Sequence, residues 1–119
     1  MEPTISLAME GSVAVATLCR PPVNAINEAW VDRLNEVLDE VAQAGQIGVL
    51  RIRSSGRAFC AGADLALMRS IFDSAAGRER MIALTRRMQE VFARLEALPQ
   101  VTLAEIGGAA MGGGFELAL

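Results

Sequence analysis

A carboxylate and a run of glycines lie close together near the end of the sequence. Residues 107–114 include five glycines, and Glu116 follows Gly113 by three positions. A strand is predicted before these glycines and a helix after them, so the first backbone amides of that helix lack partners within it. Together with the helix dipole, such amides attract anions. Because residues three apart share one face of a helix, one amide donor and the Glu116 carboxylate are predicted to converge.

Glu116 has two interpretations. A glutamate in the first turn of a helix commonly does no more than complement the helix dipole or cap free amides. Here the neighbours Phe115, Leu117 and Ala118 make the segment apolar enough to be buried. A buried carboxylate is costly unless it is paired or functional, so these neighbours favour a functional role for Glu116.

The composition excludes several kinds of chemistry. Among 119 residues there is no histidine, and all eleven cationic residues are arginine. Imidazole bases, Ser-His triads, histidine metal ligands and lysine Schiff bases are therefore excluded, and we expect no metal site. Carboxylates, backbone amides and the two cysteines remain. The glycines of residues 107–114 match neither the dinucleotide pattern GxGxxG nor the phosphate-loop pattern, so a nucleotide-binding domain is disfavoured.

Charge and hydropathy limit the partners and the compartment. The net charge of −3 disfavours a nucleic-acid partner. No apolar stretch is long enough to span a membrane, so we expect no membrane association. The two cysteines form no CxxC pair and the N-terminus shows no secretory signal, which favours a reducing cytoplasm.

Short apolar runs alternate with amphipathic patterns, which predicts one α/β domain. Strands are predicted over residues 5–9, 13–18, 47–52 and 101–106. A first helix begins near Asn27 with Trp30 on its apolar face, and either Asn27 or Asn24 can cap it. A second helix is marked by apolar residues at helical spacing between Met81 and Leu95. These elements place the glycine-rich segments in the loops that follow the third and fourth strands.

Three segments together resemble the crotonase family, the enoyl-CoA hydratases and isomerases. They are residues 56–65 (GRAFCAGADL), 108–118 (GAAMGGGFELA) and, upstream, 20–26 (RPPVNAI). The resemblance implies the crotonase α/β fold of repeated strand-strand-helix units, here truncated. It covers the whole chain but about the N-terminal half of a family subunit. We therefore expect residues 1–119 to be the N-terminal part of a single crotonase-like domain, without its C-terminal part and trimerisation helices.

The resemblance also implies roles for individual residues. In the family, the amides at positions matching Ala63 and Gly113 form an oxyanion hole for the acyl thioester carbonyl. Glu116 matches the first of two catalytic glutamates of family hydratases, and the second is expected beyond Leu119. The positions that would line the path of the CoA substrate are Ala25, Ala61, Ala63, Asp64, Leu65 and Gly113.

Two residues of the loop at 56–65 have a structural alternative that we favour. Asp64 can cap a helix that follows it rather than touch substrate. Cys60 is expected to pack beside Phe59, because only Arg57 is near enough in the sequence to lower the pKa of a nucleophilic thiol.

The expected function is that of a lyase, an enoyl-CoA hydratase that adds water to a trans-2-enoyl-CoA in fatty acid metabolism. Alternatives are another crotonase-family reaction, namely enoyl-CoA isomerisation, acyl-CoA hydrolysis or dehalogenation, or an inactive truncated fragment that binds CoA thioesters. No cofactor is expected, since coenzyme A is part of the substrate. The resemblance further implies a homo-oligomer, trimer or hexamer, in the parent protein.

Overall fold

The computed structural model describes residues 4–21, 24–56, 59–60, 62, 75–108, 110 and 117. The strands are β1 (Ile5–Glu10), β2 (Val13–Leu18), β3 (Val49–Ser54) and β4 (Val101–Ala104), and the helices are α1 (Glu28–Gln43) and α3 (Ala75–Glu96). The chain thus opens with one strand-strand-helix unit, β1–β2–α1, and continues through β3, α3 and β4. The predicted α/β class is confirmed.

The four strands form one mixed sheet in the order β1-β2-β3-β4. β1 and β2 are an antiparallel hairpin, whose turn contains Gly11 with a φ of +62° that suits glycine. β2, β3 and β4 are parallel, with Leu18 beside Ser54 and Ile52 beside Ala104. The carboxyl ends of these three strands therefore lie at the same edge of the sheet.

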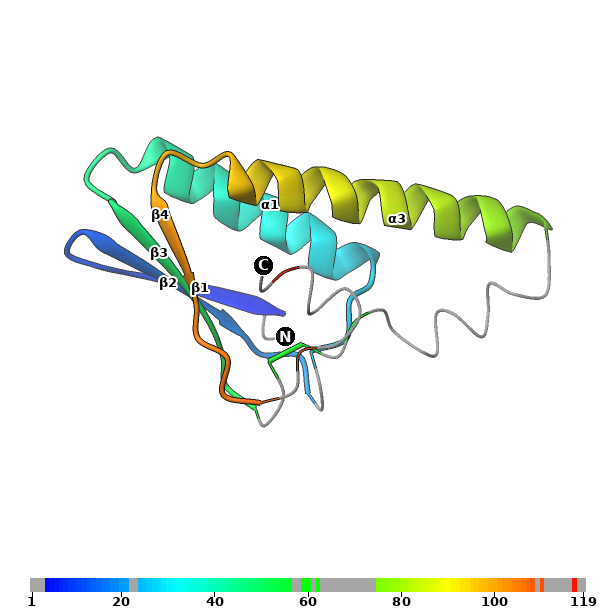
Figure 1. Cartoon of the computed structure of the whole chain (residues 1–119), viewed down its shortest axis with the longest axis horizontal. Helices are drawn as coiled ribbons and strands as arrows, with labels where there is room; N and C mark the ends of the chain where they lie inside the picture. The colour runs from blue at the N-terminus through cyan, green and yellow to red at the C-terminus, as the bar shows by residue number, and fades with distance from the viewer. Residues whose placement is uncertain are drawn as a thin grey trace.

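The helices α1 and α3 lie side by side over one face of the sheet (Figure 1). Apolar side chains at alternate strand positions, such as Ala14, Ala16 and Leu18, are buried beneath them. The predicted core position of Trp30 is confirmed, since its side chain is fully buried. β4 is more open, because the side chains of Val101 and Leu103 are 60% and 50% exposed.

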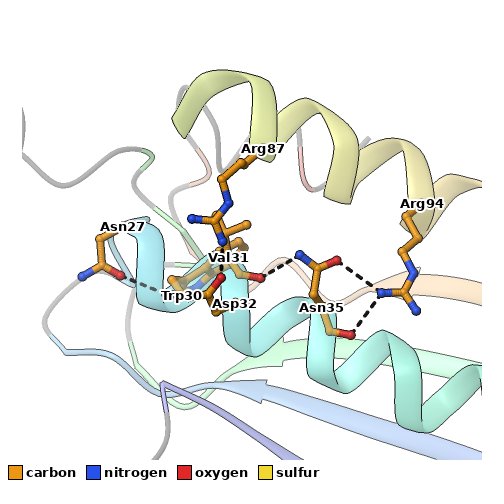
Figure 2. A network of polar contacts seen from close by, with 7 residues as sticks. All are labelled: Asn27, Trp30, Val31, Asp32, Asn35, Arg87 and Arg94. Atoms are coloured by element: carbon orange, nitrogen blue, oxygen red, sulfur yellow. Dashed lines mark hydrogen bonds and ion pairs between the residues drawn. The ribbon is translucent and has the colours of Figure 1, made fainter. Parts of the chain in front are cut away.

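Three arginines of α3 form ion pairs with acidic residues of α1. Arg80 pairs with Glu28, Arg87 with Asp32 and Arg94 with Asp39, in the same order along both helices. Figure 2 shows Arg94 also donating to the backbone and side-chain oxygens of Asn35, both at 3.2 Å. These contacts set the position of α3 along α1.

The first helix begins at a capping residue. The side-chain oxygen of Asn27 accepts a hydrogen bond from the Trp30 amide at 2.9 Å, which confirms one of the two predicted caps. Asn24, the other candidate, lies three residues earlier and makes different contacts, described below.

Within the described part of the chain, no helix is long and apolar enough to cross a membrane. Over the same residues, no cluster of three or more histidine, cysteine, aspartate or glutamate side chains could hold a metal ion.

Candidate functional site

Three loops leave the sheet at the edge where the parallel strands end. They follow β2, β3 and β4, whose last residues are Leu18, Ser54 and Ala104. Ligands of parallel sheets bind outside the carboxyl ends of the strands, where such loops meet. The glycine-rich segments singled out in the sequence belong to the second and third of these loops, so this edge is the candidate site.

The loops after β3 and β4 are joined beyond the ends of their strands. Cys60 and Ala110 form an isolated parallel β-bridge. Nearer the sheet, the Glu105 amide donates to the Ile52 carbonyl oxygen at 2.8 Å, which extends the pairing past the end of β4. The two loops therefore leave the sheet together and are still side by side at Cys60 and Ala110.

The loop after β2 is joined to the loop after β3 by backbone and side-chain contacts. The Ile26 amide donates to the Gly62 carbonyl oxygen at 2.7 Å. The side-chain amide of Asn24 donates to the Phe59 carbonyl oxygen at 2.9 Å. The Cys60 thiol in turn donates to the Asn24 carbonyl oxygen at 3.2 Å. The three loops consequently form one connected layer at the edge of the sheet.

Cys60 contributes packing and one hydrogen bond to this layer. Its side chain is fully buried, as is that of Phe59. Burial raises the pKa of the Cys60 thiol above its ordinary value, and a hydrogen bond from the Gly62 backbone offsets part of that rise. The group is therefore a protonated thiol at neutral pH, which agrees with the structural role predicted for it rather than with nucleophilic catalysis.

A cavity of about 210 Å³ lies between the loops after β3 and β4. Its walls include Ser54 at the end of β3, Phe59 from the loop that follows, and Gly107 and Gly108 from the loop after β4. The absence of side chains at the two glycines keeps the backbone of the second loop accessible there. The cavity is open to solvent and lies beside main-chain groups of the loop after β4, and Arg53 and Glu105 also line it.

Of the predicted site residues, Ala25 lies in the described layer. Its carbonyl oxygen accepts a hydrogen bond from the Arg20 guanidinium at 2.6 Å, and the residue is half-buried. Its neighbours Asn24 and Ile26 make the contacts to the loop after β3. The other predicted site residues lie outside the described residues, and they are Ala61, Ala63, Asp64, Leu65, Gly113 and Glu116.

The part that Asn24 plays in joining the loops was not predicted. The sequence suggested a helix cap, whereas the side chain is buried and contacts Ser54 and Phe59. The available signal was an asparagine inside the otherwise apolar segment 23–26. That signal identifies a polar group to be satisfied, but it does not name partners thirty or more residues away.

Sequence comparison and structure comparison both find similarity to enoyl-CoA hydratases and isomerases. The family model described as Enoyl-CoA hydratase/isomerase matches residues 8–119. A Bacillus subtilis (strain 168) protein named "Probable enoyl-CoA hydratase" is 38% identical over 115 residues, which cover 97% of this chain and 43% of the relative. The short-chain-enoyl-CoA hydratase of Clostridium acetobutylicum is 32% identical over 117 residues, again covering 97% of this chain and 43% of the relative.

The similarity extends to solved structures. The crystal structure of an enoyl-CoA hydratase from Shewanella pealeana superposes with a TM-score of 0.87 at 29% sequence identity, over 96% of this chain and 43% of that one. The chain therefore has the crotonase fold over the part it spans, which is less than half the length of these proteins. The family model, the sequence relatives and the structural neighbour agree, and the chain belongs to the enoyl-CoA hydratase/isomerase family.

Proposed function

We propose that the natural gene product containing this sequence hydrates a trans-2-enoyl-CoA to a 3-hydroxyacyl-CoA. The observation that carries the proposal is the bridge between Cys60 and Ala110. Ala63 is three positions after Cys60, and Gly113 is three positions after Ala110. Each of the two proposed amide donors therefore follows a bridged residue by three positions, which supports their placement near one another.

The two amides would act on the charge that develops during hydration. When the oxygen of water adds to C3 of the enoyl thioester, electrons move through C2 to the carbonyl oxygen and form an enolate. Hydrogen bonds from the amides of Ala63 and Gly113 stabilise that oxygen most when it is negatively charged. Donors of this kind are worth about 3–4 kcal/mol each when they are held in place before the reaction.

Glu116 is the proposed carboxylate of the reaction. It would accept a proton from the attacking water, whose oxygen bonds to C3, and return of a proton from the protonated carboxyl group to C2 would complete the net addition of one water. This assignment rests on the match of the segment around Glu116 to the family motif and on the family membership of the chain.

The proposed substrate brings its own coenzyme A, so the reaction needs no separate cofactor. Ala25, Ala61, Asp64 and Leu65 are the proposed additional contacts to the CoA part, chiefly through their backbones. The position of Ala25 in the joined loop layer supports its inclusion. A trimer or hexamer is proposed for the assembly, and sedimentation of the natural gene product tests it.

The reaction class is tested by giving the purified natural gene product crotonyl-CoA. We expect the ultraviolet absorbance of the conjugated enoyl thioester to disappear, with one water added to the product in its mass spectrum. A 3-enoyl-CoA and a saturated acyl-CoA are supplied in parallel. Isomerisation of the first or release of free CoA from the second, without hydration of crotonyl-CoA, would replace hydration by another reaction of the family. Binding of all three without turnover would identify a CoA-thioester-binding protein.

A further inference from the structure

Asn24 combines burial, an unusual backbone conformation and a fully used side chain. The exposed fraction of this residue is 3%. Among the described residues, no other Ser, Thr, Asn, Gln or charged residue is buried. Its φ of +55° is in the left-handed region, which asparagine and glycine adopt more readily than other residues. Burying a polar group in a strained conformation is costly, so its contacts must compensate for that cost.

The contacts of Asn24 use every hydrogen-bonding group of its side chain. The two hydrogens of Nδ2 go to Ser54 Oγ at 2.7 Å and to the Phe59 carbonyl oxygen at 2.9 Å. Oδ1 accepts from the Arg20 amide at 2.8 Å. One side chain thus connects the loop after β2, the end of β3 and the loop after β3.

Asparagine is specifically suited to this position. Ser54 Oγ can act as donor or acceptor, but the Phe59 carbonyl oxygen can only accept and the Arg20 amide can only donate. The partners therefore demand a side chain that donates at one end and accepts at the other. Aspartate lacks the donor, leucine lacks both groups, and glycine meets only the backbone requirement.

We infer that Asn24 is a positioning residue for the oxyanion hole, because it holds the segment at 59–62 that leads directly into Ala63. The inference rests on the proposed function for the role of the Ala63 amide. The segment is held at three successive points by residues 24–26, through the Phe59 carbonyl oxygen, the Cys60 thiol and the Gly62 carbonyl oxygen. Asn24 takes part in the first two of these contacts, and its backbone leads into the third through Ile26.

A shift of this segment should lower the rate of the chemical step more than it weakens substrate binding. A misplacement of about 1 Å caused by a residue away from the chemistry can lower the rate about 100-fold. The proposed CoA contacts of Ala25 and Ala61 adjoin the same segment, so a small rise in KM is expected, whereas the enolate oxygen depends on two amide donors held within a narrow range of distances. Loss of Asn24 should therefore lower kcat far more than it raises KM.

Asn24→Asp and Asn24→Gly test the inference in the natural gene product. The aspartate keeps the acceptor for the Arg20 amide but turns the Phe59 contact into a repulsion between two oxygens. The glycine keeps the left-handed backbone and removes all three side-chain contacts without adding charge. Asn35→Asp is the matched control, since Asn35 is also hydrogen-bonded but is a residue of α1 whose side chain accepts from Arg94 of α3.

Two readouts are measured for each variant: kcat and KM for crotonyl-CoA, and the infrared stretching frequency of the thioester carbonyl in bound butyryl-CoA. Thermal unfolding identifies a variant that has lost its fold, in which case the other Asn24 variant is used. We expect both Asn24 variants to lose about 100-fold in kcat with little change in KM, and the carbonyl frequency to move toward its value in free butyryl-CoA. Asn35→Asp should leave both readouts unchanged.

The readouts separate this inference from the proposed function. If the wild-type protein does not hydrate crotonyl-CoA but its bound carbonyl is shifted, and the shift is lost in the Asn24 variants, hydration is wrong and the positioning role stands. If the wild-type protein hydrates crotonyl-CoA and folded Asn24 variants keep both kcat and the carbonyl shift, the positioning role is wrong and hydration stands.

Discussion

The backbone of Cys60 lies beside that of Ala110 in a parallel β-bridge, although the two residues belong to loops that follow different strands. The bridge continues the pairing of β3 with β4 beyond the sheet. Because the strands are parallel, Cys60 and Ala110 lie side by side with their chains running in the same direction. This relationship is the structural basis for proposing that one amide from each loop serves the same carbonyl oxygen.

The first prediction concerns the proposed carboxylate. Glu116→Gln should lower kcat for crotonyl-CoA hydration by about 100- to 10,000-fold, the usual contribution of a general acid or base. Acyl-CoA affinity should change little, because the amide is similar in size and the CoA contacts are elsewhere. Steady-state hydration and equilibrium binding of butyryl-CoA measure the two effects.

Glu90→Gln is the matched control for that variant, since Glu90 is exposed on α3. It should hydrate crotonyl-CoA at the wild-type rate. Equal turnover by Glu116→Gln and Glu90→Gln would remove Glu116 from the mechanism.

The second prediction concerns the buried thiol. Cys60→Ser should retain hydration, because the hydroxyl can donate to the Asn24 carbonyl oxygen as the thiol does. Loss of turnover in a folded Cys60→Ser protein would contradict the structural role. The free energy of unfolding should fall by about 1 kcal/mol, from less favourable burial of a more polar group. Urea unfolding followed by circular dichroism measures the stability.

Cys60 should also make stability depend on alkaline pH. Its pKa is raised in the folded protein, so the folded state holds the thiol proton more tightly than the unfolded chain does. The free energy of unfolding should therefore decrease as the pH rises above the ordinary thiol pKa of about 8.5 and approaches the folded value. This contribution is absent from Cys60→Ser, and an identical alkaline decline in both proteins would assign it to other groups.

The third prediction concerns the start of α1. Asn27→Ala should lower the free energy of unfolding by about 1 kcal/mol, because the Trp30 amide loses its capping acceptor. Asn27→Ser should lose much less, since serine supplies another oxygen. Chemical denaturation compares the three proteins, and equal stability of the alanine and serine variants would show that the cap contributes little.

The fourth prediction concerns the arginines between the helices. Arg80→Ala removes an exposed pair with Glu28 and should cost less than about 1 kcal/mol. Arg94→Ala should cost more, about 1–2 kcal/mol, because it also removes two hydrogen bonds to Asn35 (Figure 2). Chemical unfolding at low and high salt measures which variant loses more stability. High salt should reduce the loss caused by Arg80→Ala. A larger loss in Arg80→Ala would contradict the structure.

Local sequence patterns predicted most of the fold. The run at 13–18 is a strand with those bounds, because alternate residues face a buried layer. The third strand was expected at 47–52 but is Val49–Ser54, since the Ile47 amide instead donates to Ala44 and closes the turn after α1. α3 begins at Ala75, earlier than the apolar stripe from Met81 indicated. Its first turns hold Arg80 against Glu28, a contact that an apolar pattern does not reveal.

The candidate site was predictable only in part. The glycine-rich segments and their places after the third and fourth strands could be read from composition and spacing. The contacts that join them could not, because Asn24 meets Ser54 and Phe59 through the pairing of β2 with β3. Such long-range partners depend on strand order and register, which a single sequence leaves open.

The most direct test of the central claim is a crystal structure of the natural gene product bound to acetoacetyl-CoA, a thioester that stands in for the enoyl-CoA substrate. The distances to measure run from the thioester carbonyl oxygen to the backbone nitrogens of Ala63 and Gly113. We predict that both are about 2.7–3.1 Å, the range for donors in an oxyanion hole. A carbonyl oxygen that contacts neither amide, in a site otherwise filled by the ligand, would contradict the account.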